Sequence, residues 1–152
     1  MGREKIRLVD QQWFNNLFIG GSGLKPAPEG RPGYAIDHNV YLDGVGKHPS
    51  LDQAGIAGVK PSGSRFKSES RSATLEFNAD SAIFGKTCPR ISSATIGKLS
   101  VSKMTIETPD GRPLEIATDY FGQPIQSGHV LPGPFQAMKA GTNSLNLWPR
   151  NK

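Results

Sequence analysis

The sequence predicts an all-β fold in which β-solenoid coils are followed by an antiparallel β region. Three observations support this prediction. A short apolar stretch occurs twice with a constant offset, Gly and Pro are abundant, and a Pro-Asp-Gly turn separates two β-type runs in the second half. Gly and Pro contribute 18 and 12 of the 152 residues, well above their average combined share of about 12%. Such a composition favours a turn-rich β protein over a helical one.

The repeat consists of residues 13–21 and 36–44, and its offset of 23 residues is the difference between Asn16 and Asn39. Repeats of about 20–50 residues indicate solenoids or arrays, and β-type residues at this length favour a β-solenoid coil. The residues that coincide are Asn16 with Asn39, Leu17 with Val40, Phe18 with Tyr41, Ile19 with Leu42, and Gly21 with Gly44.

The elements of the first half follow from local patterns. Residues 6–9 form a short apolar strand, and Gly20-Gly21 closes the strand of the first repeat. Residues 22–33, rich in Pro and Gly, form a loop. The second repeat leads into a long excursion at 45–72, in which Leu51–Ile56 forms one helical turn.

The second half is predicted to be antiparallel. Residues 72–78 alternate as a half-buried strand does. The runs 101–107 and 112–117 flank Thr108-Pro109-Asp110-Gly111, where Pro presets the turn and Gly takes a positive φ, so a hairpin is expected. We therefore divide the chain into 1–71, terminal coils with long loops, and 72–152, a β region that packs on or caps the coils.

Two coils are too few to be stable by themselves, because a solenoid buries its core by stacking about three or more repeats. Either the second half caps the coils, or the chain belongs to a longer protein. The charged start of the chain has no apolar stretch after it, so neither a signal peptide nor a membrane span is expected. No membrane partner is predicted.

The net charge of +5 and the pI of about 9.5 are compatible with nucleic acid, an anionic membrane or an acidic polysaccharide. The cations are scattered and do not interleave with aromatic residues, so no nucleic-acid partner is predicted. A single cysteine, Cys88, excludes an intrachain disulfide. His38, His48 and His129 lack the spacing of a zinc site. We predict no metal and no cofactor.

Residues 13–19 and 36–41 resemble the "N-N-x-F" coils of right-handed parallel β-helix proteins, the pectate-lyase-like group. Residues 108–113, 119–122 and 133–136 resemble the final β segment of such proteins in bacteria. The resemblance implies a right-handed parallel β-helix and the C-terminal portion of a longer carbohydrate-active protein, secreted or periplasmic, with its catalytic coils upstream.

In such coils Leu17, Ile19, Val40 and Leu42 are expected to point inward and stack coil upon coil. Asn16 and Asn39 are expected at equivalent corners, where Asn tolerates a left-handed backbone and hydrogen-bonds its counterpart. Phe18 and Tyr41 then face outward, or stack on each other beneath a covering loop.

Three residues are candidates for catalysis. Asp37 and Asp43 could form the acid/base pair of a glycoside hydrolase, although both also fit ordinary turn positions. Lys67 belongs to a basic cluster that could abstract a proton in a polysaccharide lyase. Alternatively, the cluster lies on a solvated loop without a catalytic role. The other members of this cluster are Lys60, Arg65 and Arg71.

Three further residues, Trp13, His38 and Tyr41, are candidates for contact with a carbohydrate, because exposed aromatic rings stack on sugars. Buried packing is the alternative for the two aromatic residues. The predicted function is the C-terminal part of a polysaccharide-acting β-helix protein, of glycoside hydrolase or polysaccharide lyase type, whose partner is a polysaccharide or oligosaccharide. Alternatives are a non-catalytic carbohydrate-binding or adhesion module and a basic intracellular binding domain.

Overall fold

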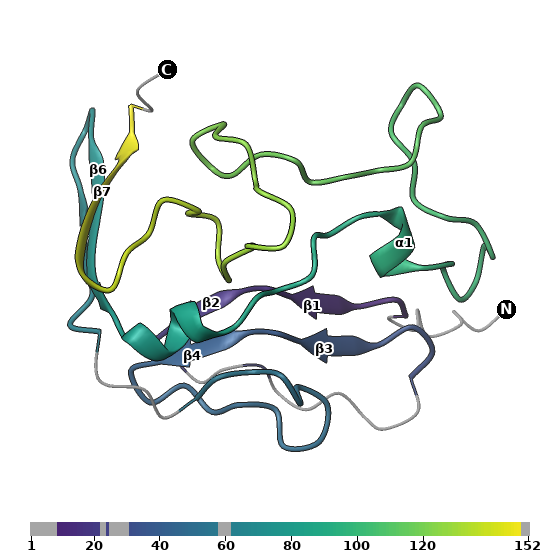
Figure 1. Ribbon diagram of the computed structural model, residues 1–152, viewed down its shortest axis with the longest axis horizontal. Helices are drawn as coiled ribbons and strands as arrows, with labels where there is room; N and C mark the ends of the chain where they lie inside the picture. Colours follow the sequence, from purple (N-terminus) through teal and green to yellow (C-terminus); the bar gives the residue numbers. More distant parts are fainter. Residues whose placement is uncertain (1–8, 22–23, 25–30, 58–61, 150–152) are drawn as a thin grey trace, which may run out of the picture.

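The computed structural model describes residues 9–21, 24, 31–57 and 62–149. Each coil has two three-residue strands joined by a two-residue corner. The strands are β1 (Gln12–Phe14) and β2 (Leu17–Ile19), then β3 (Ala35–Asp37) and β4 (Val40–Leu42). β1 pairs in parallel with β3, and β2 with β4, so the coils lie side by side (Figure 1). The register of β2 and β4 matches the 23-residue repeat, and the prediction of all-β parallel β-helix coils is confirmed.

A third rung continues the stack after a shorter interval. Ile56 forms a parallel bridge with Val40, and its N–H donates to the carbonyl of Asn39 over 2.8 Å. The predicted helical turn at Leu51–Ile56 is wrong. The chain instead makes a tight turn, closed by the N–H of Gly55 on the carbonyl of Asp52, because residue 56 must return to the edge of β4.

A ladder of side-chain amides holds the corners together. Asn39 is 0% exposed, and its Oδ1 accepts from both the backbone N–H and the Nδ2 of Asn16, each over 2.8 Å. Its Nδ2 donates to the carbonyl of Trp13 over 2.8 Å and to Oδ2 of Asp52 over 2.9 Å. The predicted hydrogen bond between the side chains of Asn16 and Asn39 is confirmed.

The left-handed backbone lies one residue earlier than expected. Asn15 has a φ of 56° and His38 a φ of 58°, whereas Asn16 and Asn39 are not among the residues with positive φ. The first corner residue makes the turn, which leaves the second free to begin the next strand and to direct its amide at the neighbouring coil. The prediction for Asn16 and Asn39 is wrong on this point.

The two faces of the coils are both covered. In Figure 1 the segment 43–57 lies on one side of the strands and residues 81–136 lie on the other. The apolar side chains of β2 and β4 stack as predicted, and they pack against the second half of the chain and against Ile56. The buried core on this face contains Val40, Leu42, Phe77, Ala79, Ile83, Leu131, Phe135 and Met138.

The opposite face carries the aromatic residues. The rings of Phe18 and Tyr41 are stacked, with centroids 5.2 Å apart and planes 15° apart. The hydroxyl of Tyr41 donates to Oδ2 of Asp52, on the 43–57 return loop, over 2.7 Å. Of the two arrangements predicted for this pair, stacking beneath a loop is therefore the one found.

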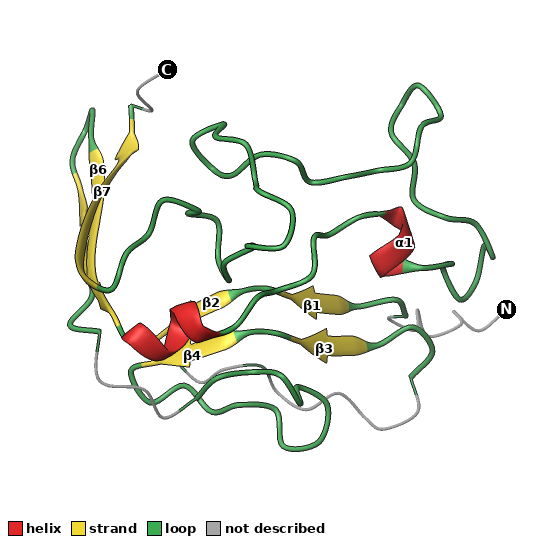
Figure 2. Ribbon diagram, viewed as in Figure 1, coloured by secondary structure: helices red, strands yellow, loops and turns green. Residues whose placement is uncertain are grey.

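The second half contains an antiparallel sheet in the order β5 (Arg65–Ser68), β6 (Ala73–Ala79), β7 (Gly141–Trp148) (Figure 2). The β5–β6 hairpin crosses the boundary placed between 71 and 72, and the division of the chain there stays a prediction. Leu75 and Phe77 of β6 turn toward the coils and join the core. The sheet therefore covers one end of the coil face.

Short helical segments connect the sheet to a long irregular arm. The 3₁₀ helix η1 (Ser81–Gly85) starts at Asp80, whose side chain accepts from the N–H of Ala82, and it buries Ile83 completely. Helix α1 (Ser93–Ile96) starts at Ser92, whose hydroxyl accepts from the N–H of Thr95. The arm beyond α1 folds back over the coils (Figure 1).

The hairpin predicted around 108–111 is present as a turn but not as two strands. The N–H of Thr108 donates to the carbonyl of Arg112, and Glu107 bridges Pro113 antiparallel. No further strand forms in this described arm, because Pro113 has no N–H to donate and the flanking apolar side chains have little to pack against. Met104 is 64% exposed. The strand expected at 6–9 lies largely outside the described residues, and so does most of the loop expected at 22–33.

Candidate functional site

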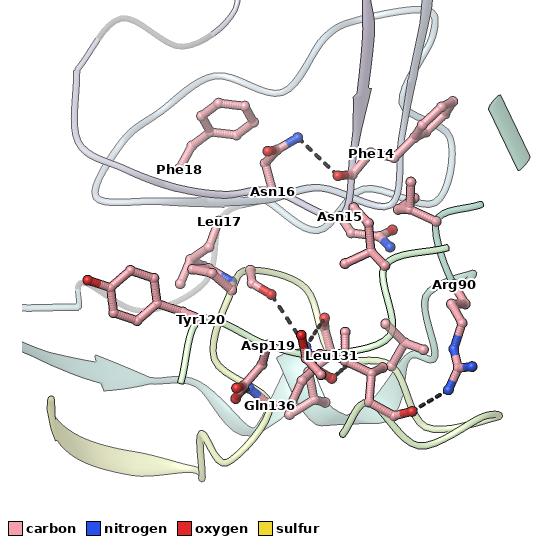
Figure 3. Close-up of a pocket in the computed structure, with 17 residues that line it drawn as sticks. Phe14, Asn15, Asn16, Leu17, Phe18, Arg90, Asp119, Tyr120, Leu131 and Gln136 are labelled. Atoms are coloured by element: carbon pink, nitrogen blue, oxygen red, sulfur yellow. Dashed lines mark hydrogen bonds between the residues drawn. The ribbon is translucent and has the colours of Figure 1, made fainter. Parts of the chain in front are cut away.

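A pocket of about 410 Å³ lies between the corner of the first coil and the arm (Figure 3). It combines aliphatic, aromatic and polar side chains. The coil contributes Phe14, Asn15, Asn16, Leu17 and Phe18, and the rest of the wall comes from Arg90, Ile91, Ile116, Thr118, Asp119, Tyr120, Ile125, Val130, Leu131, Gly133, Pro134 and Gln136. Ligand pockets are typically concave sites of roughly 300–1,000 Å³ lined mainly by apolar groups and a few polar ones. This pocket has that character.

Asn15 connects the coil corner to the opposite wall of the pocket. Its side-chain Nδ2 donates to the carbonyl of Pro89 over 2.7 Å, and its backbone carbonyl accepts from the N–H of Gly133 over 2.6 Å. Gly133 has a φ of 85°, and a Cβ there would lie 3.0 Å from the Cβ of Leu17. This close approach requires glycine and fixes the width of the pocket at this point.

Arg90 closes one side of the pocket. Its guanidinium donates to the carboxylate of Glu115 and to the carbonyl of Ile125, so it joins two stretches of the arm. The Nε of Arg90 and the Oδ1 of Asn15 are buried without a hydrogen-bond partner among the described residues. Both side chains therefore keep hydrogen-bonding capacity that the described residues do not use.

The far wall is held rigid by its own hydrogen bonds. Oδ1 of Asp119 accepts from the N–H groups of Phe121 and Gln123, each over 2.9 Å, and Oδ2 accepts from the N–H of Gln136 over 3.2 Å. The Gln136 side chain in turn accepts from the N–H of Leu131 and donates to its carbonyl. The carboxylate of Asp119 is therefore held by the backbone of the turn that follows it and by Gln136.

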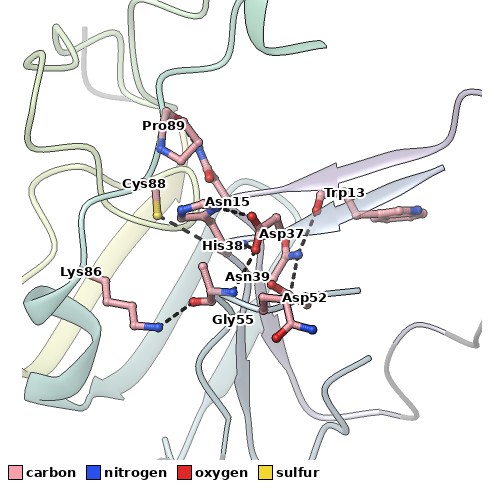
Figure 4. Close-up of polar contacts among 12 residues, drawn as sticks. Trp13, Asn15, Asp37, His38, Asn39, Asp52, Gly55, Lys86, Cys88 and Pro89 are labelled. Carbon is pink, nitrogen blue, oxygen red and sulfur yellow. Dashed lines mark hydrogen bonds and ion pairs between the residues drawn. The ribbon is translucent and has the colours of Figure 1, made fainter. Parts of the chain in front are cut away.

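Asp37 and His38 are brought together in a second cluster (Figure 4). Their side chains are 3.1 Å apart, from Oδ2 to Nδ1, and both are partly exposed. Burial opposes ionisation of Asp37, but hydrogen bonds from the N–H groups of Ala54 and His38, together with the charge of the His38 ring, hold its pKa below the usual value. Asp37 thus anchors the turn at 52–55.

Asp43, the second predicted acid, clamps a different loop. Its carboxylate accepts from the N–H and the hydroxyl of Ser62, each over 2.5 Å, and from the hydroxyl of Ser64 over 3.3 Å. The hydrogen bonds from Ser62 lower the pKa of Asp43. Asp37 and Asp43 hold different segments, the turn at 52–55 and the serines at 62 and 64, so each carboxylate has its own structural contacts.

Lys67 lies on β5, with its ammonium 4.0 Å from the carboxylate of Glu76. Its neighbours Arg65 and Arg71 are also exposed, which fits a solvated charged hairpin. Lys60 lies outside the described residues. None of the described basic residues of this cluster lines the pocket.

Of the predicted aromatic contacts, Trp13 is available and Tyr41 is not. Trp13 is 36% exposed, with its ring 6.3 Å from that of Phe18. Tyr41 is 1% exposed, and burial together with the hydrogen bond to Asp52 raises the pKa of its hydroxyl. A sugar cannot stack on a ring that is covered on this scale, so Tyr41 is a packing residue.

Cys88 is buried next to His38. The sulfur of Cys88 is 3.8 Å from the backbone carbonyl of His38. Burial, and then the negative charge of Asp37, raises the pKa of this thiol to about 11. A thiol so weakly ionised at neutral pH is a poor nucleophile. Across the part of the chain that the structure describes, no group of three or more His, Cys, Asp or Glu could hold a metal ion.

Asn16, Leu17 and Phe18 of the predicted repeat line the pocket, but the sequence pattern does not predict the roles of Asn15 and Arg90. These two side chains shape the pocket through contacts with Pro89, Glu115 and Ile125. A local sequence pattern does not predict such long-range contacts. No described helix has the length and hydropathy needed to span a bilayer.

No protein-family model and no curated protein matches the chain. Among solved structures, it is similar to one described as the complex structure of XylC with xylose. The TM-score is 0.77 at 19% sequence identity, and the alignment covers 92% of this chain and 26% of that chain. The likeness is one of fold. It agrees with the parallel coils seen here, and this chain spans about a quarter of the XylC chain.

Proposed function

We propose that this chain is a saccharide-binding portion of a carbohydrate-active β-helix protein, and that the pocket between the first coil and the arm receives a sugar unit. The observation that carries the proposal is the pocket itself, about 410 Å³ in volume with apolar walls and interspersed polar side chains. Sugars present apolar ring faces and polar edges, and a wall of this composition suits both. XylC, which shares the fold, was solved with xylose.

Binding without catalysis is the better supported form of this proposal. Hydrolysis of a glycoside requires two carboxyl groups that flank the bond. At the pocket, Asp119 accepts three backbone N–H groups and Glu115 is paired with Arg90. These carboxylates are occupied by structural contacts. We therefore assign to this chain a scaffold role and a glycan contact.

A finer assignment rests on the resemblance of the coils and the tail to β-helix proteins. We propose that the chain forms the C-terminal portion of a longer polysaccharide-acting protein, with any glycoside hydrolase or lyase centre on other coils. Trp13, exposed beside Phe18, remains a proposed second contact along a longer glycan.

A pocket-filling variant tests the proposal. Ile116 lines the pocket and is 47% exposed, so Ile116→Trp should fill the space without disturbing the core. Val101, on the same arm and 75% exposed, does not line the pocket, and Val101→Trp is the matched control. Binding of neutral and acidic oligosaccharides is measured by titration calorimetry and by amide chemical-shift changes.

We expect binding by the wild type and by Val101→Trp, and at least a tenfold loss in Ile116→Trp. Trp13→Ala, compared with Trp148→Ala at a more exposed tryptophan that does not line the pocket, measures the contribution of the second contact. The proposal fails if a folded wild-type sample binds no saccharide of the panel, or if Ile116→Trp binds as well as the control.

A further inference from the structure

We infer that the pocket accepts a neutral sugar unit and discriminates against uronic acids. This inference rests on the proposed saccharide-binding function and specifies its ligand class. It is opposite to what the basic net charge of +5 suggests, because the charge that matters is the local one.

Arg90 is the cation, and Asp119 the carboxylate, among the described residues that line the pocket. Proteins that select a uronate use an uncommitted Arg or Lys, because an arginine fork matches a carboxylate in two parallel hydrogen bonds. Both terminal nitrogens of Arg90 already have partners. One donates to Glu115 and the other to the carbonyl of Ile125, and the donor without a partner, Nε, is buried.

The position of Glu115 in the fold favours its ion pair with Arg90. Its backbone forms an antiparallel bridge with Ser92, next to the α1 cap, so the carboxylate is presented to Arg90 from a fixed strand-like segment. The Glu115 side chain is 49% exposed and that of Arg90 is 27% exposed. The pair thus sits at the rim, where an incoming carboxylate would have to compete with Glu115 for the guanidinium.

The remaining charge repels an anion. Arg90 contributes +1, while Glu115 and Asp119 contribute −1 each, which gives a formal local charge of −1. Asp119 cannot release this charge by turning away, since three backbone N–H groups hold its carboxylate. A uronate would therefore enter a site of negative formal charge whose cation is already paired with Glu115, and like charges brought together disfavour binding. A neutral pentose or hexose carries no such penalty.

One group of exposed cations lies outside the pocket. Arg65, Lys67 and Arg71 belong to the β5–β6 hairpin, and none of them lines the pocket. They could attract an acidic glycan to the surface without placing it in the pocket. Any experiment must therefore isolate binding in the pocket from binding at this hairpin.

The test compares methyl glucoside with methyl glucuronide, and methyl galactoside with methyl galacturonide, which differ at C6 alone. Methyl xyloside is added as a neutral sugar without C6. Binding is measured on the full chain, and the pocket contribution is the part abolished by Ile116→Trp. Two variants are compared: Glu115→Gln, which removes the partner charge of Arg90, and Glu107→Gln, which makes the same charge change on an exposed arm residue that does not line the pocket.

In the wild type we expect at least one neutral glycoside to bind about tenfold more tightly than its uronate counterpart. Glu115→Gln should raise uronate affinity about tenfold, the scale of one charge-assisted hydrogen bond, and leave neutral binding within about twofold. Glu107→Gln should change neither. Equal or tighter uronate binding in the wild type overturns the inference while leaving saccharide binding intact, and so does an unchanged uronate affinity in Glu115→Gln. Absence of all saccharide binding removes the proposed function itself.

Discussion

The amide ladder at the coil corners offers a quantitative test of how the coils are held together. Asn39→Ala removes four hydrogen bonds, all between 2.8 and 2.9 Å. Three involve neutral partners, at about 1 kcal/mol each, and the fourth involves the carboxylate of Asp52, at about 2 kcal/mol. The expected loss is about 5 kcal/mol, because Asn39 is fully buried and water cannot replace its amide.

Asn16→Ala is the matched control. It removes two hydrogen bonds donated by its Nδ2, to Phe14 and to Asn39, and leaves the backbone N–H of Asn16 on the ladder. The expected loss is about 2 kcal/mol. The two free energies are measured by urea unfolding followed by circular dichroism, with an osmolyte added if Asn39→Ala lacks a folded baseline. If Asn39→Ala costs no more than Asn16→Ala, the ladder does not stabilise the coils as argued.

Three further predictions concern single residues. Because hydrogen bonds from Ser62 lower the pKa of Asp43 in the folded state, its stabilising contribution is present above the unfolded pKa of about 3.9 and is lost as pH falls below it. Asp43→Asn should flatten the dependence of the urea midpoint on pH below about pH 4, and an unchanged slope contradicts this. With its pKa raised to about 11, Cys88 should react with iodoacetamide at pH 8 at least about 100-fold more slowly in the native than in the urea-unfolded protein; comparable rates would show that the thiol is accessible. Gly133→Ala should cost about 1–2 kcal/mol in urea unfolding, given its φ of 85° and the 3.0 Å approach to Leu17, and full retention of stability would contradict the close approach.

The coils could be predicted because their signal is local and repeated. The alignment of Leu17 on Val40 in the sequence is the register of the two strands in the structure. The period of two along β2 and β4 also separates the aliphatic set from Phe18 and Tyr41. It does not say which set faces the return loops, because both faces are covered. That choice depends on residues more than 30 positions away, such as Phe77.

The pocket could not be predicted for a related reason. Asn15 and Arg90 acquire their roles through Pro89, Glu115 and Ile125, and these contacts join segments without regular secondary structure. Asp37 and Asp43 are candidates for an acid/base pair on the sequence alone, because both are acidic and they are close in sequence. Their carboxylates instead close turns with backbone N–H and serine groups, which is the ordinary use of aspartate beside a strand.

The ladder at the corners also has a direction. Asn39 accepts from Asn16 and donates to Asp52, and an amide can pass such a chain onward because it has both a donor and an acceptor. An ionised carboxylate accepts but has no hydrogen to donate. Asp52, which accepts from Asn39 and from the hydroxyl of Tyr41, is therefore the last acceptor of this run among the described residues, and the corner amides donate in one direction, from Asn16 toward Asp52.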